Sequence, residues 1–481
     1  MMHRVPPQTD AQLIAGFLTQ HRFSEALTHA QAWRERAPRD VHAHAAVVQS
    51  LLPLGRLAAT AEAADRGLIL SPVDPTLNLL RAVIDHRLGR TDAAVKRLTA
   101  LLSRAPANEI DATITLAEVL QRSGRSTEVA ALIAKGGAWL ADERAQVCVA
   151  RATARTDRSR RGLRAARVAH GTGNAQLKRI AGFEAVRLHD AAGRYREAFA
   201  LATTLHRETT PTFDIGEVEM DVAEQLRLMP RLRAVNRTAA DAIGAEAAFV
   251  IGLPRSGTTL LEQMLDRHPS ICGIGEFEGA FAIRETLTGL GVWPSNLRAL
   301  AASDAARLAG EYLSAASDLR RTGARVTFDK TLHGWRMLPA LAAVLPNAAF
   351  VHLCRSPRDT AISMFLSNFH PRAWGFTREL SMIRRIIALE RRLVKPMFDA
   401  LGVKSVSIVY EELVDHPERE IRRALEVIGV AFDAAVLTPE QNTRTVLTLS
   451  HEQVRRSINR SSIGRWKNYE FAFDSEWDSL S

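Results

Sequence analysis

A short polar stretch at Gly252–Thr259, with the sequence GLPRSGTT, has residue types that could hold an anion. It follows an apolar run and precedes an apolar-periodic segment, which together predict a strand, a tight loop and a helix. The backbone N–H groups of such a loop and the N-terminus of the helix point at one spot. Arg255 adds a positive charge, and hydroxyl donors follow at Ser256, Thr258 and Thr259. The stretch therefore predicts a phosphate-binding loop.

This loop has the spacing of a nucleotide-triphosphate P-loop but differs from it in one residue type. Such a P-loop reads G-x-x-x-x-G-K-[ST], and its lysine reaches the β- and γ-phosphates. Here Thr258 stands in the place of the lysine, so the side chain that neutralises a transferring γ-phosphoryl group is missing. An ATP-dependent kinase is the less favoured of the enzyme hypotheses.

The longer string PRSGTTLLEQMLDRHPSICGIGE resembles the 5′-phosphosulfate-binding region of sulfotransferases that use 3′-phosphoadenosine 5′-phosphosulfate (PAPS). It is most similar to the tyrosylprotein sulfotransferase branch and to bacterial sulfotransferases with tetratricopeptide (TPR) repeats. The resemblance covers roughly Ala247 to Trp466. It implies sulfonate transfer from PAPS to a hydroxyl, with adenosine 3′,5′-bisphosphate as the product. The sequence shows no cluster of metal ligands, so no metal is expected. The implied 5′-phosphosulfate contacts are Arg255, Ser256, Gly257, Thr258 and Thr259.

The same resemblance implies the catalytic groups. It places a catalytic glutamate at Glu276, where a carboxylate can take the proton of an attacking hydroxyl. It places an active-site lysine at Lys330, which would stabilise charge on the leaving phosphate. His333 is a rival base, because other PAPS sulfotransferases use a histidine after such a lysine. Glu278 is a weaker candidate.

A second phosphate site is implied by Arg355 and Ser363, which keep the eight-residue spacing of the family's 3′-phosphate contacts. The family often has another arginine four residues later, where this chain has Ser367. Tyr410 matches a position near the nucleotide. The segment LSHEQVRRSINRSSIGRW resembles the closing cofactor loop, in which Ser450 would contact the transferred sulfonate and Asn459 and Arg465 the nucleotide.

The elements that must position these residues alternate between strands and helices. Apolar runs at Ala247–Leu253, Val326–Phe328, Ala348–Cys354 and Ser405–Val409 are separated by helical patterns, which predicts a parallel sheet covered by helices. Ligands of such sheets bind at the carboxyl ends of the strands, and the polar motifs follow those ends. We expect a P-loop-like α/β sulfotransferase domain over 236–481.

The first half of the chain carries a helical repeat. His21, Gly55 and Gly89 are 34 residues apart, and so are the prolines Pro38, Pro72 and Pro106. Small residues follow each turn at Ala26, Thr60, Ala94, Val129 and Ala198. A 34-residue period with small residues at helix contacts is typical of TPR repeats. The sequence predicts an α-helical TPR solenoid over 1–235, degenerate near 150–170, where seven arginines lie within Arg151–Arg167.

Composition limits the remaining hypotheses. The 481 residues are 46% hydrophobic and carry a net charge of +10, and no aromatic residues interleave with the arginine cluster, so nucleic acid is not an expected partner. Three cysteines without CxxC pairs fit a reducing compartment. We see neither a signal peptide nor a membrane span, and expect a cytoplasmic protein. The resemblance also implies that a homodimer is possible, because members of the family often pair through their catalytic domains.

The acceptor stays open at this stage. Tyrosylprotein sulfotransferases place arginines just after the catalytic glutamate to receive acidic peptides, but this chain reads Phe277-Glu278-Gly279-Ala280. A protein tyrosine, a saccharide and a small molecule are all candidates, and a TPR groove could hold a protein acceptor. The alternative to an enzyme is a TPR scaffold whose second domain binds nucleotide without turnover.

Overall fold

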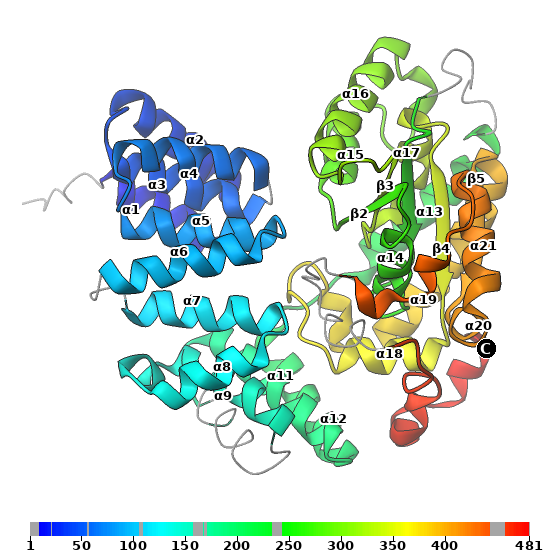
Figure 1. Cartoon of the computed structure of the whole chain (residues 1–481). Helices are drawn as coiled ribbons and strands as arrows, with labels where there is room; N and C mark the ends of the chain where they lie inside the picture. The colour runs from blue at the N-terminus through cyan, green and yellow to red at the C-terminus, as the bar shows by residue number, and fades with distance from the viewer. Residues whose placement is uncertain are drawn as a thin grey trace, which may run out of the picture. The chain divides into compact units, whose positions relative to one another are not determined.

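The structure is a computed structural model (Figure 1) that describes residues 9–20, 22–54, 57–104, 109–156, 167, 171–232, 243–442 and 457–480. The contacts divide the chain into two compact units. Unit 1 comprises 1–181 with 444–447, and unit 2 comprises 182–443 with 448–481. Helix α11 (Ala175–Ala191) runs through the division at 181/182.

Unit 1 consists of helices that pair along the chain. The described helices are α1 (Asp10–Thr19), α2 (Phe23–Arg36), α3 (Val41–Leu51), α4 (Leu57–Leu70), α5 (Pro75–Arg87), α6 (Thr91–Arg104), α7 (Glu109–Arg122), α8 (Ser126–Lys135) and α9 (Glu143–Thr156). Helices α4, α6 and α8 begin at residues 57, 91 and 126, so the helix pairs follow the predicted period. Because each helix pair contacts the next pair in sequence, the unit is a stack of helical hairpins.

The small residues of the repeat are the points where these helices pack. Ala26, Thr60 and Ala94 are fully buried, and Val129 is nearly so. A small side chain lets two helix backbones approach closely. Of the repeat markers, His21, Gly55 and Pro106 lie outside the described residues, as does most of the Arg151–Arg167 cluster.

Unit 2 is built on a five-stranded sheet of order β2-β3-β1-β4-β5, and every strand pair is parallel. The strands are β1 (Ala247–Ile251), β2 (Ile271–Gly275), β3 (Val326–Asp329), β4 (Ala349–Cys354) and β5 (Lys404–Val409). Helices α14 (Thr258–Asp266), α15 (Gly279–Gly289), α16 (Ala302–Asp318), α17 (Leu338–Val344), α18 (Pro357–Phe365), α19 (Leu380–Leu401), α20 (Tyr410–Asp415) and α21 (Pro417–Ile428) surround it. The predicted parallel sheet is confirmed. The strand that the sequence analysis missed is β2, because its ICGIG sequence contains two glycines, which weaken a strand pattern.

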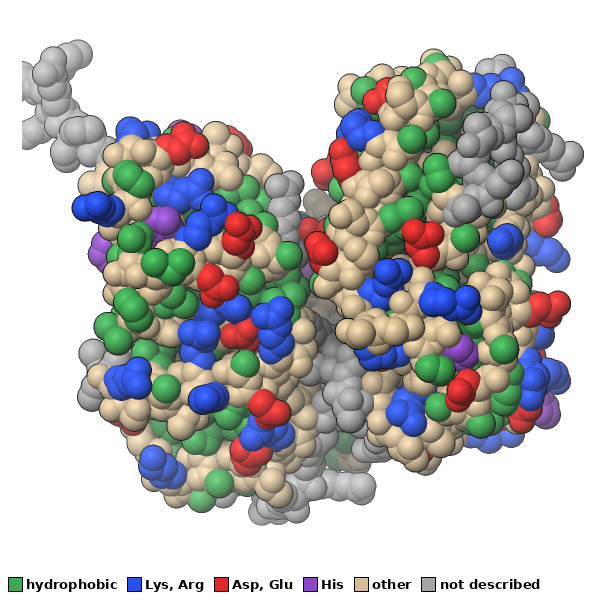
Figure 2. All heavy atoms as spheres, turned by 45° about the horizontal axis from the view of Figure 1, so that its top comes forward, with side chains coloured by type: hydrophobic (Ala, Val, Ile, Leu, Met, Phe, Trp, Pro, Cys, Tyr) green, Lys and Arg blue, Asp and Glu red, His purple; other side chains and the backbone are tan. Residues whose placement is uncertain are grey.

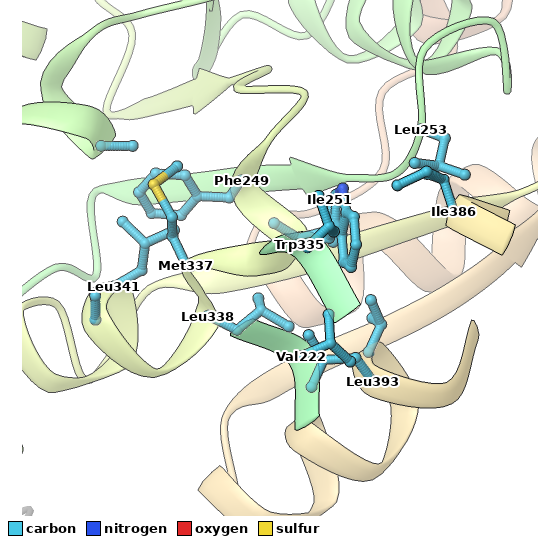
Figure 3. Packing of buried hydrophobic residues seen from close by; sticks show 14 of the residues in the cluster. Val222, Phe249, Ile251, Leu253, Trp335, Met337, Leu338, Leu341, Ile386 and Leu393 are labelled. Atoms are coloured by element: carbon cyan, nitrogen blue, oxygen red, sulfur yellow. The ribbon is translucent and has the colours of Figure 1, made fainter. Parts of the chain in front are cut away.

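The sheet separates two hydrophobic cores, as the alternation of β1 requires. Phe249 and Ile251 face a core with Trp335 of the segment before α17 and Leu393 of α19 (Figure 3). The intervening Ala248 and Val250 face a second core with α14 and α21. Every residue of β1 is buried, so the loop that follows β1 starts from a rigid base.

Three helices that precede the sheet in sequence pack into the first of these cores. Phe183 and Val186 of α11, Leu205 of α12 (Tyr195–Thr209) and Val222 of α13 (Ile215–Leu232) belong to it. The predicted domain boundary near 235 lies outside the described residues, whereas the packing divides the chain at 181/182. Apolar periodicity shows that a helix has a face to bury but not which neighbour covers it.

Surface charges of both signs are interspersed. On the face shown in Figure 2, Lys and Arg side chains alternate with Asp and Glu side chains over the helices of unit 1. Among the helices of the described ranges, none is long and apolar enough to cross a membrane.

Candidate functional site

The pocket of unit 2 lies at the carboxyl end of the sheet. The chain leaves the central β1 toward β2 and β3 and then returns to its other side at β4, and a ligand crevice is expected where the connections part. The pocket is lined by three segments that directly follow strands, and by the C-terminal segment. Its lining residues are Arg255, Gly257, Thr258, Thr259, Leu260, Arg355, Asp359, Ser363, Tyr410, Ser457, Ile458, Asn459, Ser461, Ser462 and Arg465.

The loop after β1 has a special backbone. Gly257 has φ of 103°, and Arg255 has φ of 67°, a left-handed value that only a few per cent of non-glycine residues adopt. A Cβ atom at Gly257 would lie 2.3 Å from Cδ2 of the Tyr410 ring. Glycine is therefore required at 257 both by the backbone angle and by the close approach of Tyr410. Thr258 and Thr259 then start α14, whose N-terminus faces the pocket.

The Ser256 side chain is hydrogen-bonded within the loop itself. Its hydroxyl donates to the Leu253 carbonyl at 2.7 Å, its side chain is buried, and it is not among the pocket-lining residues. The hydroxyl thus closes the turn. The structure does not bring the Ser256 side chain to the pocket lining.

Two arginines and a serine meet across the pocket. Nε of Arg255 donates to Oγ of Ser363 at 2.9 Å, and Nη1 of Arg355 donates to the Arg255 carbonyl at 2.8 Å. Arg355 also donates to the Ser462 carbonyl, and its guanidinium lies 4.9 Å above the Tyr410 ring. Loop 254–259, α18 and α20 are therefore joined around a single pocket.

These arginines are buried close together, which is electrostatically costly without an anion. Burial, together with the charges of Arg355 and Arg465, lowers the pKa of Arg255 to about 10. Burial also lowers the pKa of Arg355, whose Nε atom is buried and has no hydrogen-bond partner in the described structure. An anion in the pocket would reduce the mutual repulsion and satisfy this donor.

The C-terminal segment forms the remaining wall. Arg465 begins η9 (Arg465–Ala472) and pairs with Asp190 of α11. Burial lowers the pKa of Arg465, but the Asp190 carboxylate outweighs it, so the net shift is upward. Asn459 lines the pocket and is exposed, and its side chain donates to the Ser457 carbonyl. Ser450 lies outside the described residues.

Asp359 is a pocket residue that the sequence analysis did not single out. It is 1% exposed, and its carboxylate accepts from the backbone N–H groups of Gly464 at 2.7 Å and Trp466 at 2.8 Å. The neighbouring Arg358 guanidinium lies 4.8 Å above the Trp466 ring. These two residues fasten the C-terminal segment to α18. The only sequence signal was an Arg-Asp pair at a helix start, which also occurs in ordinary caps.

The two residues predicted as the base and the charge-stabilising cation, Glu276 and Lys330, meet at the ends of β2 and β3. Nζ of Lys330 donates to Oε1 of Glu276 at 2.8 Å. The Lys330 side chain is 1% exposed, whereas that of Glu276 is 50% exposed. A buried cation thus holds a carboxylate that remains accessible from solvent, an arrangement able to take a proton from an approaching hydroxyl. Neither residue lines the arginine pocket.

His333, the rival base, is held against aromatic rings. It stacks on Trp374 with ring centroids 4.0 Å apart, and Phe281 meets its edge. Burial and the charges of Arg336 and Arg284 lower the pKa of His333 to about 4. The ring is therefore neutral at pH 7 but is a weak base.

Asp329, the last residue of β3, directly precedes Lys330. It accepts from Tyr312 Oη at 2.8 Å and Thr331 Oγ1 at 2.7 Å, and it is fully buried. Burial raises the pKa of Asp329 to about 7, although both hydrogen bonds oppose the shift. Its position before an expected catalytic lysine was the only signal in the sequence.

Comparisons with known proteins concern the sheet-containing part of unit 2. A profile of the Sulfotransferase family matches residues 247–434. The chain therefore carries a sulfotransferase family domain. It is 27% identical to the protein-tyrosine sulfotransferase 1 of Danio rerio over 45% of this chain and 64% of that protein. It is likewise 27% identical to protein-tyrosine sulfotransferase A of Caenorhabditis elegans, over 45% of this chain and 60% of that protein.

Two further similarities extend this comparison. An uncharacterized protein of Aquifex aeolicus (strain VF5) is 30% identical over 46% of this chain, but the chain spans only 30% of its length. Among solved structures, the sulfotransferase domain from the curacin biosynthetic pathway aligns with 48% of this chain and 95% of its own, at 17% identity and a TM-score of 0.35. The chain spans less than two thirds of the length of the Aquifex, Danio and Caenorhabditis proteins.

Proposed function

We propose that the protein transfers a sulfonate group from PAPS to a hydroxyl acceptor. The observation that carries the proposal is the meeting of Arg255, Arg355 and Arg465 in one pocket that also contains the N-terminus of α14. Three guanidinium groups, a helix N-terminus and a glycine turn together suit a ligand with more than one anionic group.

The residues present fit the donor. The loop Arg255–Thr259, apart from Ser256, would hold the 5′-phosphosulfate, and Arg355 with Ser363 would hold the 3′-phosphate. The unpartnered buried Nε of Arg355 is a donor that a phosphate oxygen would satisfy. Tyr410 would flank the nucleotide, and Asn459 and Arg465 would complete the pocket. When bound, PAPS supplies an activated sulfonate with a phosphate leaving group.

The chain's own residues supply proton transfer and charge stabilisation. Glu276 takes the proton of the acceptor hydroxyl at its half-exposed carboxylate. Lys330 holds that carboxylate in place and contributes a fixed positive charge from its buried position. Ser450 is a further proposed donor to the sulfonate. His333 ranks behind Glu276 as the base, because its lowered pKa makes it a weak proton acceptor.

The acceptor and the role of the helical repeat complete the proposal. A protein tyrosine is one acceptor, since the named relatives include protein-tyrosine sulfotransferases; a saccharide or a small molecule is another. We interpret the 34-residue helix pairs of unit 1 as TPR-type repeats that bind a protein. The second candidate function is that of a repeat scaffold whose second domain binds a nucleotide without catalysis. Such a protein would need the arginine pocket but not the Glu276–Lys330 pair.

The decisive experiment compares nucleotides by calorimetric titration of the full chain. We expect adenosine 3′,5′-bisphosphate to bind at least tenfold more tightly than adenosine 5′-monophosphate, since one further charge-assisted contact contributes about 1.5 kcal/mol or more. Equal affinities, or a preference for ATP, would contradict the PAPS assignment. Transfer of labelled sulfonate from PAPS to a cell extract would then identify the acceptor, and its absence would favour the scaffold.

A further inference from the structure

The helix pair α11–α12 contacts two walls of the nucleotide pocket. All the residues concerned lie in unit 2. Near the end of α11, the Asp190 carboxylate accepts from the Arg465 guanidinium and, at 2.6 Å, from the Tyr469 hydroxyl. Tyr195, at the start of α12, packs edge-on against the Tyr469 ring at 5.3 Å between centroids. This end of the helix pair therefore holds the pocket wall formed by η9.

Helix α12 also contacts α18, the helix that carries Ser363. The Nε2–H group of His206 donates to the Phe365 carbonyl at 2.8 Å, and His206 is 1% exposed. The Phe199 ring stacks on the Phe365 ring at 4.8 Å. The two walls of the pocket are thus joined by helices that lie far before them in the sequence.

Asp190 is more than a surface ion-pair partner. Its side chain is 15% exposed, and it faces an arginine whose pocket already contains two other guanidinium groups. Like charges would drive Arg465 away from Arg255 and Arg355. The Asp190 carboxylate opposes this movement because it accepts a hydrogen bond from Nη2 of Arg465. The other N–H donors of the guanidinium are left for a ligand.

We propose that Asp190 is a positioning residue of the nucleotide site, which acts through Arg465 and makes the helix pair α11–α12 a part of the donor-binding unit. The proposal rests on the proposed function, because it takes adenosine 3′,5′-bisphosphate as the ligand. It assigns these helices to the catalytic unit rather than to the array of repeats that could bind a partner. A purely structural role of Asp190 would not depend on the side chain at 465.

The test is a double-mutant cycle in the full-length chain, with the dissociation constant of adenosine 3′,5′-bisphosphate as the readout. We expect Asp190→Ala to weaken binding about tenfold, and to have no further effect in a chain that already carries Arg465→Gln. Glu197→Ala is the matched control, because it removes one exposed acid from α12 without touching the pocket. It should leave the dissociation constant unchanged.

The alternatives predict different results. Loss of an acid alone would strengthen anion binding, so equal or tighter binding by Asp190→Ala would overturn the proposal, as would losses that add in the double variant. Asp190→Asn retains a hydrogen-bond acceptor and should lie between the wild type and the alanine variant; it replaces the latter in the cycle if thermal unfolding shows that the alanine variant is unfolded. A wild type without affinity for the bisphosphate would reject the proposed function itself, whereas a wild type that binds and a cycle without coupling would reject only the role of Asp190.

Discussion

The arginine pocket and the Glu276–Lys330 pair are assembled in different ways. Arg255 and Arg355, which meet in the pocket, are 100 residues apart, and the pocket is closed by a segment still further along the chain. The pair comes from two adjacent strands, where the backbone N–H of Lys330 donates to the Gly275 carbonyl at 2.8 Å. In the proposed function, binding of the donor would therefore depend on long-range packing, whereas proton transfer would depend on the register of β2 and β3.

The largest expected effect tests the pair. Glu276→Gln is nearly isosteric and still offers Lys330 an acceptor, but it cannot take a proton. We expect the turnover of sulfonate transfer to fall by about 10²–10⁴-fold, with an unchanged dissociation constant for adenosine 3′,5′-bisphosphate. Glu285→Gln, which removes an exposed acid from α15, is the control and should retain activity. Equal losses in nucleotide binding and in turnover would show that the arginine pocket and the Glu276–Lys330 pair do not act separately.

The next effect tests the pocket. Arg355→Ala removes contacts with the Arg255 and Ser462 carbonyls and the guanidinium beside Tyr410. Binding of the bisphosphate should weaken by about 10–100-fold, because a hydrogen bond to a charged group contributes about 1.5–3 kcal/mol. Binding of the 5′-monophosphate should change less. Titration of the variant with both nucleotides measures the two losses in affinity. Arg355→Lys should recover only part of the lost affinity, since lysine lacks the planar guanidinium of arginine.

A smaller effect tests the loop that follows β1 and lines the arginine pocket. Gly257→Ala places a Cβ atom against Tyr410 at a positive φ, and we expect a loss of about 1–3 kcal/mol in the free energy of unfolding. Denaturation by urea measures it. Adding Tyr410→Ala should relieve the collision but not the backbone strain. Gly289→Ala is the matched control, because no atom lies within 4 Å of its Cβ position; a similar loss there would contradict this explanation.

The smallest expected effect concerns Asp329, which directly precedes Lys330 in the chain. The pKa of Asp329 is raised to about 7 in the folded chain, so the folded state binds a proton more tightly than the unfolded state. The contribution to stability is complete below pH 4 and is lost as the pH rises toward 7. Between pH 6 and 7, the free energy of unfolding should fall by about 1 kcal/mol.

The check is a series of chemical denaturation curves at several pH values. Asp329→Asn should remove this slope, whatever its effect on absolute stability. Asp318→Asn, at an exposed acid of α16, should retain it. A slope that survives in Asp329→Asn would assign the titration to another group.

The same contrast explains what could be predicted from sequence. The parallel sheet and the loop after β1 follow from local patterns, because apolar runs and a glycine turn are contiguous in the chain. The motifs after β1, β4 and β5 do meet at one edge of the sheet. The roles of Asp359 and Asp190 could not be predicted, because each depends on partners 105 and 275 residues away. Ser256 was interpreted as a ligand because its type fits a phosphate, and only the turn geometry shows its carbonyl partner.

The carboxylate of Asp359 has a practical consequence for anyone who shortens this chain. A protein that ends before Gly464 would lose the two backbone donors of a carboxylate that is 1% exposed. The stranded charge would add a penalty of about 1–3 kcal/mol per lost bond to the missing stretch of pocket wall. Removal of the C-terminal segment would therefore destabilise α18, which carries Asp359. A soluble fragment obtained in this way would have a different affinity for the nucleotide from that of the whole protein.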